Sequence, residues 1–177
     1  MLACEQDAPA SRGGEVIAPS IAEVDVFGVR FGMTGEAFAT LCREGNQAGL
    51  LRNGEGMQVR MELPGKDFPG SAYVEFYPRF TATQGVTAIP LQFSLHNYSP
   101  WNEATHADQI VPSVLSVLDS LVPGGPFSPG KDALGNLRFH RCAEGYQTVV
   151  RTSEERFVEV EFALLNTPES KCLCCDE

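Results

Sequence analysis

Apolar and polar residues alternate with a period of two in several stretches of the chain, which predicts β-strands with one buried face. The alternation is clear in residues 57–63, 72–76 and 89–95, and it returns in residues 137–142 and 146–166. The polar positions of the first three strands predict an antiparallel sheet with one face open to solvent or to a partner. That face carries Gln58, Arg60, Glu62, Tyr73, Glu75, Tyr77, Gln92 and Ser94.

Two other stretches have the period of an amphipathic helix. Residues 34–45 place their apolar side chains on one face, between a threonine N-cap and a glycine C-cap. Residues 105–122 carry an apolar stripe, and Thr105 stands three residues before an acid, at capping-box spacing. Ahead of the first helix, residues 24–33 change the parity of their apolar side chains at Gly28, which predicts a bulged strand.

The order of these elements is a helix followed by three strands, twice over, and it predicts an α+β fold. We expect two helix-on-antiparallel-sheet units in tandem, residues 22–99 and 100–166, forming one compact domain or two small ones. A loop rich in Pro and Gly is expected at residues 123–136. Residues 1–21 have the composition of a disordered tether, and residues 167–177 form a cysteine-rich tail.

One motif carries a resemblance to known families. The passage VRFGMTGEAFATL, residues 29–41, resembles the Gly-Met-Thr start of the first helix in small outer-membrane assembly lipoproteins. Two consecutive helix-plus-sheet units are similar to the tandem repeat of β-lactamase-inhibitor-like proteins. These resemblances imply an α+β fold, an exported location and binding through a sheet face or loops, without catalytic residues. The chain departs from both families in its long loops and its clustered C-terminal cysteines.

The charge balance narrows the range of partners. Thirteen Lys and Arg stand against 23 Asp and Glu, which gives a formal net charge of -10. This charge repels nucleic acid and anionic lipid head groups and favours association with a basic protein. No apolar run approaches the roughly 18 residues that span a bilayer, so the membrane is expected to be reached only through a lipid anchor.

The N-terminal stretch predicts such an anchor. Leu2, Ala3 and Cys4 resemble the end of a lipobox, and the polar residues 5–20 after them resemble a lipoprotein tether. Six cysteines are also many for a protein of a reducing compartment. We therefore expect a periplasmic or outer-membrane-anchored lipoprotein that is acylated at Cys4. The alternative is a cytoplasmic protein with a free Cys4.

In an oxidising compartment the remaining cysteines are expected to form a disulfide. Cys142 lies near the end of a predicted core strand, and a bridge from it to Cys172 would hold the polar tail against the domain. The alternative is a soft-metal site built from His140, Cys142, Cys172 and Cys174, because imidazole and thiolate groups bind zinc and copper. Cys42, on the apolar face of the first helix, is expected to remain a buried thiol.

No nucleophile elbow, P-loop, dinucleotide fingerprint or HExxH helix is present, so we expect neither catalytic residues nor a cofactor. The leading hypothesis is a non-enzymatic, exported binding or inhibitor-like module that uses an acidic, aromatic-bearing sheet face on an envelope or secreted protein. Tyrosine and tryptophan are frequent at binding hot spots. The predicted binding residues are Tyr73, Tyr77, Tyr98 and Trp101. The alternatives are a metal-binding or redox protein and a small hydrolase.

The lipid anchor gives the first prediction. The reading frame upstream of Met1 should encode a basic start and an apolar stretch of about 7 to 15 residues that ends at Ala3. Natively expressed protein should partition into a detergent phase, and Cys4→Ser should move it to the aqueous phase because serine has no thiol to acylate. Wild-type protein that stays in the aqueous phase would exclude the anchor.

Overall fold

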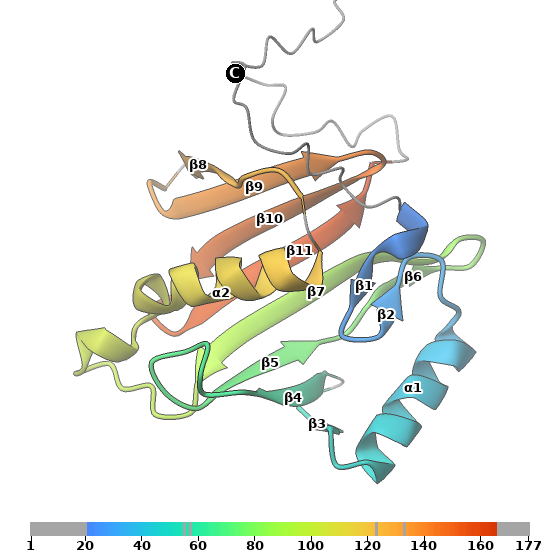
Figure 1. Ribbon diagram of the computed structural model, residues 1–177, viewed down its shortest axis with the longest axis horizontal. Helices are drawn as coiled ribbons and strands as arrows, with labels where there is room; N and C mark the ends of the chain where they lie inside the picture. Colours follow the sequence, from blue (N-terminus) through green and yellow to red (C-terminus); the bar gives the residue numbers. More distant parts are fainter. Residues whose placement is uncertain (1–20, 55, 57, 123, 133, 166–177) are drawn as a thin grey trace, which may run out of the picture.

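The computed structural model describes residues 21–165 apart from residues 55, 57, 123 and 133. In this part of the chain, one antiparallel sheet of nine strands carries most of the structure, and the predicted α+β class is confirmed (Figure 1). Its strands are β3 (Leu51–Asn53), β4 (Val59–Leu63), β5 (Ala72–Phe76), β6 (Arg79–Thr81), β7 (Gly85–Leu95), β8 (Ser128–Lys131), β9 (Leu137–Ala143), β10 (Tyr146–Ser153) and β11 (Phe157–Leu164).

The strand β7 lies near the centre of the sheet and connects its two halves. The spatial order is β3-β4-β5-β7-β11-β10-β9-β8, and β6 pairs with the first part of β7. On one side β7 pairs with β5 and β6, and on the other side it pairs with β11, where Leu91 lies opposite Val160. The strands of both predicted units therefore belong to a single sheet.

One face of the sheet is covered by α2 (Ala107–Leu121) and a hairpin of β1 (Asp25–Val26) and β2 (Val29–Arg30), and α1 (Gly35–Gln47) packs at the edge of the sheet against β3. Figure 1 shows α2 lying across the strands and the β1–β2 hairpin beside it. Two short 3-10 helices, η1 (Ile21–Glu23) and η2 (Glu103–Thr105), precede β1 and α2. Within the described residues, no helix combines the length and the apolar character that a membrane crossing requires.

The core lies between this layer and the sheet, and it uses the apolar positions that the period of two selects. Phe93 and Phe162 from the sheet and Ile110 and Leu118 from α2 are fully buried in it. Each such side chain contributes about 2 kcal/mol relative to leaving it exposed. The first helix starts as predicted, because the Thr34 hydroxyl accepts a hydrogen bond from the Ala37 N–H at 3.2 Å.

The bulged strand predicted for residues 24–33 is wrong, since this stretch folds into the β1–β2 hairpin. Phe27 and Gly28 have φ angles of 54° and 85°, and two successive positive φ values reverse the chain rather than bulge it. The Asp25 carboxylate accepts the Gly28 N–H at 2.7 Å and supports the turn. The parity change at Gly28 thus marks a turn between two strands.

The start of the second helix also differs from the prediction. The N-cap of α2 is His106, and Thr105 belongs to η2 and is buried. The Thr105 hydroxyl donates to the Asn102 carbonyl at 2.7 Å and accepts from the Ser99 N–H at 3.0 Å. A capping box at Thr105 is therefore wrong, because this hydroxyl closes the preceding loop.

Three short strands lie in stretches for which no strand was predicted. The strands β3, β6 and β8 have three, three and four residues, and β8 lies inside the expected loop 123–136. Strands of this length show too few alternations to establish a period of two. They form because a longer neighbour offers its free hydrogen-bonding edge.

A buried arginine joins the end of α2 to the sheet. Arg141, in β9, donates to the Asp119 carboxylate at 2.7 Å and to the Val122 carbonyl at 2.8 Å. Its guanidinium carbon lies 4.2 Å from the centre of the Phe127 ring. Because the last carbonyls of a helix have no partner within the helix, this arginine supplies a donor where α2 ends.

Replacing this side chain should destabilise the fold. Arg141→Met leaves the Val122 carbonyl buried without its donor, so we expect the free energy of unfolding to fall by about 2 kcal/mol. Urea denaturation followed by circular dichroism measures the change. The control is Arg138→Met in the same strand but on the opposite face, for which we expect a change below about 0.5 kcal/mol. Equal midpoints for the two variants would contradict the assigned role.

Candidate binding face

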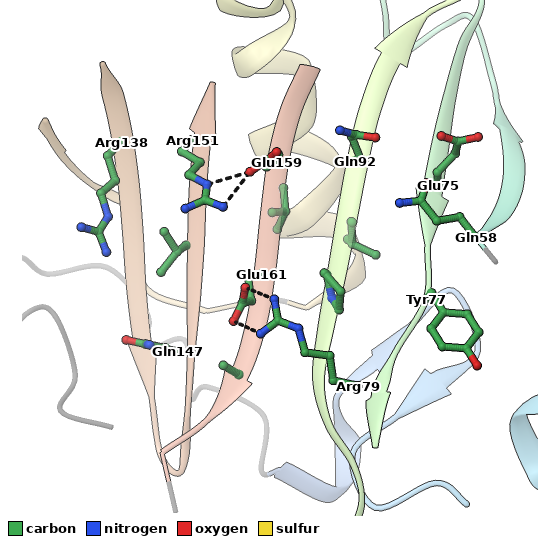
Figure 2. Close-up of a pocket in the computed structure, with 15 residues that line it drawn as sticks. Gln58, Glu75, Tyr77, Arg79, Gln92, Arg138, Gln147, Arg151, Glu159 and Glu161 are labelled. Atoms are coloured by element: carbon green, nitrogen blue, oxygen red, sulfur yellow. Dashed lines mark hydrogen bonds and ion pairs between the residues drawn. The ribbon is translucent and has the colours of Figure 1, made fainter. Parts of the chain in front are cut away.

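The sheet face opposite the helices contains a hollow of about 420 Å³, here called the open-face hollow (Figure 2). Its floor is formed by β5, β7, β9, β10 and β11. Four residues that the sequence placed on the polar face line it, namely Gln58, Glu75, Tyr77 and Gln92. The other polar lining residues are Arg79, Arg138, Gln147, Arg151, Glu159 and Glu161.

The strand register builds a row of polar side chains across the hollow. Arg138 lies opposite Arg151, Arg151 opposite Glu159, and Glu159 opposite Gln92. Gln92 in turn lies opposite Glu75. Directly opposed residues lie on the same face with their Cβ atoms about 5 Å apart. The register therefore makes neighbours of side chains that are far apart in the sequence, such as those of Gln92 and Glu159.

Two ion pairs cross the hollow between strands. Arg151 donates from Nε and Nη2 to Glu159 Oε2 at 2.8 and 2.7 Å. Arg79 donates to both carboxylate oxygens of Glu161, at 3.3 and 3.0 Å. Figure 2 shows both guanidinium groups turned towards their carboxylates. Exposed pairs of this kind contribute about 1 kcal/mol or less, so a charged partner can compete for them.

The formal charge of the hollow is balanced, with three arginines and three glutamates in its lining. The prediction of an acidic sheet face is therefore wrong for the hollow. The alternation of the strands and their register bring both signs of charge to this face. The excess of acidic residues in the chain therefore lies outside the hollow lining.

A buried ion pair forms one border of the hollow. Only 3% of the Glu75 surface is exposed, and its Oε1 accepts from Arg60 Nε at 2.9 Å and Nη2 at 2.7 Å. The hydrogen bond with Glu75 raises the pKa of Arg60. The guanidinium also stacks 4.2 Å from the centre of the Tyr73 ring. A Cβ added to Gly54 would lie 2.8 Å from the carboxylate, so the β3–β4 turn closes over Glu75.

The predicted aromatic set does not gather at one place. Tyr77 is 37% exposed and lines the hollow, whereas Trp101 is 92% exposed and lies in the loop before η2. Tyr73 is 3% exposed, so its predicted exposure is wrong: its hydroxyl accepts from Arg156 Nη2 at 3.0 Å. Tyr98 is half-buried beside the same Arg156. Of the four predicted residues, only Tyr77 belongs to the hollow.

The histidines do not form a hydrolase triad in the part of the chain that is described. His96 Nε2 lies 2.6 Å from a Glu62 carboxylate oxygen, and the His106 ring contacts the Tyr98 ring. His140 lies in β9. No histidine ring in the described ranges hydrogen-bonds to a serine or a cysteine. The hydrolase alternative therefore has no assembled site among these residues.

The cysteines are described only in part. Cys42 is a half-buried free thiol, and burial raises the pKa of that thiol. Cys142 lies in β9 on the same parity as His140 and is engaged in an interaction. The predicted sites at Cys4 and Cys172, together with Cys174, lie outside the described residues. Lipidation, the disulfide and the soft-metal site thus remain predictions, and residues 21–165, the four gaps aside, contain no group of three or more metal-binding side chains.

Six polar residues of the hollow were not predicted from the sequence. Arg79 belongs to a three-residue strand, and the others lie in β9, β10 and β11, whose outward positions were not assigned to the same face as those of β4, β5 and β7. Their period of two does identify these outward positions. The pairing of β7 with β11 joins the outward face of β4, β5 and β7 to that of β9, β10 and β11. A single sequence contains no pattern that predicts this pairing.

No family model matches this chain, and neither the curated proteins nor the solved structures include a significant match.

The two kinds of ion pair on this face should differ in their effect on stability. Arg60→Met leaves the buried Glu75 carboxylate without its guanidinium, so we expect the free energy of unfolding to fall by about 3 kcal/mol. Arg79→Met breaks an exposed pair and should cost less than about 1 kcal/mol. Thermal and urea unfolding of both variants measure the difference. Losses of equal size would show that burial does not distinguish the pairs.

Proposed function

We propose that this protein is a non-enzymatic binding module of the bacterial envelope that holds a partner protein against the open-face hollow. The observation that carries the proposal is a hollow on the sheet face that no described helix covers, lined by side chains with charged and amide ends. A few polar groups converging on a concave surface give specificity to a binding site. Because these groups project from paired strands, they are held in place before a partner arrives.

The chemistry of the lining favours a protein partner over an apolar small molecule. Arg79 and Arg151 each offer a planar guanidinium, and Gln92 offers an amide that has no hydrogen bond to a described residue. Arginine and tyrosine are enriched at protein interfaces, and Tyr77 stands at the border of the hollow. Trp101, in a separate loop, is a further apolar anchor for a large partner.

The remaining features belong to the same proposal. We infer that the chain is an exported lipoprotein with an anchor at Cys4, and that its two helix-plus-sheet units are tandem repeats of one architecture. The order of elements supports the second point: α1 precedes strands β3 to β7, and α2 precedes strands β8 to β11. The net charge of -10 favours a basic partner during approach, while the balanced hollow provides the local contacts.

A second function rests on the cysteines. His140 and Cys142 share one parity of β9, so the thiolates of Cys172 and Cys174, if they reached these two residues, would complete a four-ligand soft-metal or redox site. The two functions are separated by their requirements. Partner binding depends on the hollow, whereas metal binding depends on the tail cysteines.

The test is to fill the hollow without disturbing the core. Gln92→Trp places an indole at the centre of the face, and Ser116→Trp places the same group on the exposed side of α2 as the control. The full chain and both variants are used to capture proteins from a cross-linked envelope fraction, with mass spectrometry as the readout. We expect a partner that is recovered with the wild type and with Ser116→Trp, and at least about tenfold less with Gln92→Trp.

Two results would contradict the proposal. One is equal recovery of every captured protein with both tryptophan variants, because the hollow would then not be the contact surface. The other is the absence of any hollow-dependent partner together with stoichiometric zinc or copper in natively isolated protein, which would favour the metal-binding function.

A further inference from the structure

Arg138 differs from the other arginines of the hollow because no carboxylate among the described residues pairs with it. Arg79 and Arg151 each pair with a glutamate, but Arg138 forms no ion pair with a described residue. Figure 2 shows its side chain extended along the sheet face, on the side of Arg151 away from Glu159, with no interaction drawn to it. Arg138 is half-buried as a residue, and a guanidinium with no counter-charge among the described residues is a site where an incoming anion gains energy.

The register adds a second arginine to the same place. Arg138 lies directly opposite Arg151, and like charges in this position destabilise a strand pair. Glu159 carries one negative charge and pairs with Arg151, so the two arginines and this glutamate together keep one positive charge in excess. An anion placed between the two guanidinium groups would relieve this repulsion.

The edge of the sheet leaves room for that anion. On the other side of β9, Arg138 lies opposite Gly130, which has no side chain to cover it. The acid of the β8–β9 turn does not serve as the partner, because the Asp132 carboxylate accepts from Leu134 and Asn136 N–H groups at 2.8 and 2.9 Å. The Asn136 side-chain amide also donates to this carboxylate at 2.9 Å, and this bond, followed by the one from the Asn136 N–H, lowers the pKa of Asp132.

We propose that Arg138 and Arg151 form a carboxylate clamp, and that the partner protein places one Asp or Glu side chain from an extended segment between them. This inference rests on the proposed function and specifies the chemistry of the contact. A carboxylate fits because guanidinium groups bind its two oxygens in a planar, charge-assisted geometry. A peptide segment fits because the hollow continues from the clamp towards Gln92, where a neighbouring polar group can bind.

A defined peptide tests the clamp on the full chain. The probe is acetyl-Gly-Glu-Gly-Glu-Gly-amide, its glutamine counterpart is the control ligand, and the Nε–Hε signals of the arginines are followed by nuclear magnetic resonance. We expect the glutamate peptide to shift the Arg138 and Arg151 signals and to bind about tenfold more tightly than the glutamine peptide. Arg138→Gln should remove that difference, while Arg43→Gln, an exposed change on α1, should preserve it.

Three results would overturn the clamp. If the Arg138→Gln variant binds both peptides with the affinities of the wild type, this guanidinium does not take part in binding. Sodium acetate that shifts the Arg138 signal at the same concentration as the peptide would indicate a small-anion site. An Arg138 signal that moves without peptide when Glu169, Asp176 and Glu177 are changed to amides would show that the chain's own tail occupies the clamp.

The clamp and the proposed function fail in different ways. Consider the partner whose recovery falls with Gln92→Trp. If Arg138→Gln recovers as much of this partner as the wild type does, the clamp is wrong and the binding function stands. If no version of the protein recovers a partner that depends on Gln92, the binding function itself is wrong, whatever the peptide does.

Discussion

The pairing of β7 with β11 is the interaction on which the rest of the structure depends. Along this boundary six residue pairs, from Val158↔Phe93 to Ala163↔Ala88, join strands from the two halves of the chain. The contact has two consequences because side chains alternate between faces. It merges two apolar surfaces into one core beneath α2, and it merges two polar surfaces into one open face. A separate sheet in each half would have left two unpaired edges where β7 and β11 now meet.

The two faces stabilise the protein in different ways. On the covered face, burial of apolar side chains supplies most of the free energy, and Arg141 secures the end of α2 to the sheet. On the open face, polar side chains bind one another across strands, and among the described ion pairs of this face only the one with Arg60 has a carboxylate, that of Glu75, that is almost fully buried. The exposed pairs contribute little to folding, so this face can exchange its internal contacts for contacts with a partner.

The division of roles also explains why aromatic residues alone were a poor guide to the binding surface. Tyr73 stands on the polar parity of β5, yet Arg60 stacks on its ring and Arg156 donates to its hydroxyl, so it is buried. An arginine on a neighbouring strand covers a tyrosine only when the register places the two side by side. Arg138, by contrast, is not covered by the residues opposite it, because these are an arginine and a glycine.

The sequence by itself determined the elements whose signal is local. The period of two located the longer strands, the threonine cap at Thr34 located the start of α1, and the polar parity identified Gln58, Glu75, Tyr77 and Gln92 as members of one face. Only the tertiary structure decided that this face continues across β11 to β9, that short strands complete the sheet, and that residues 27 and 28 turn a hairpin. The physical reason is that strand pairing is a contact between distant segments, and its register depends on the packing of the whole core.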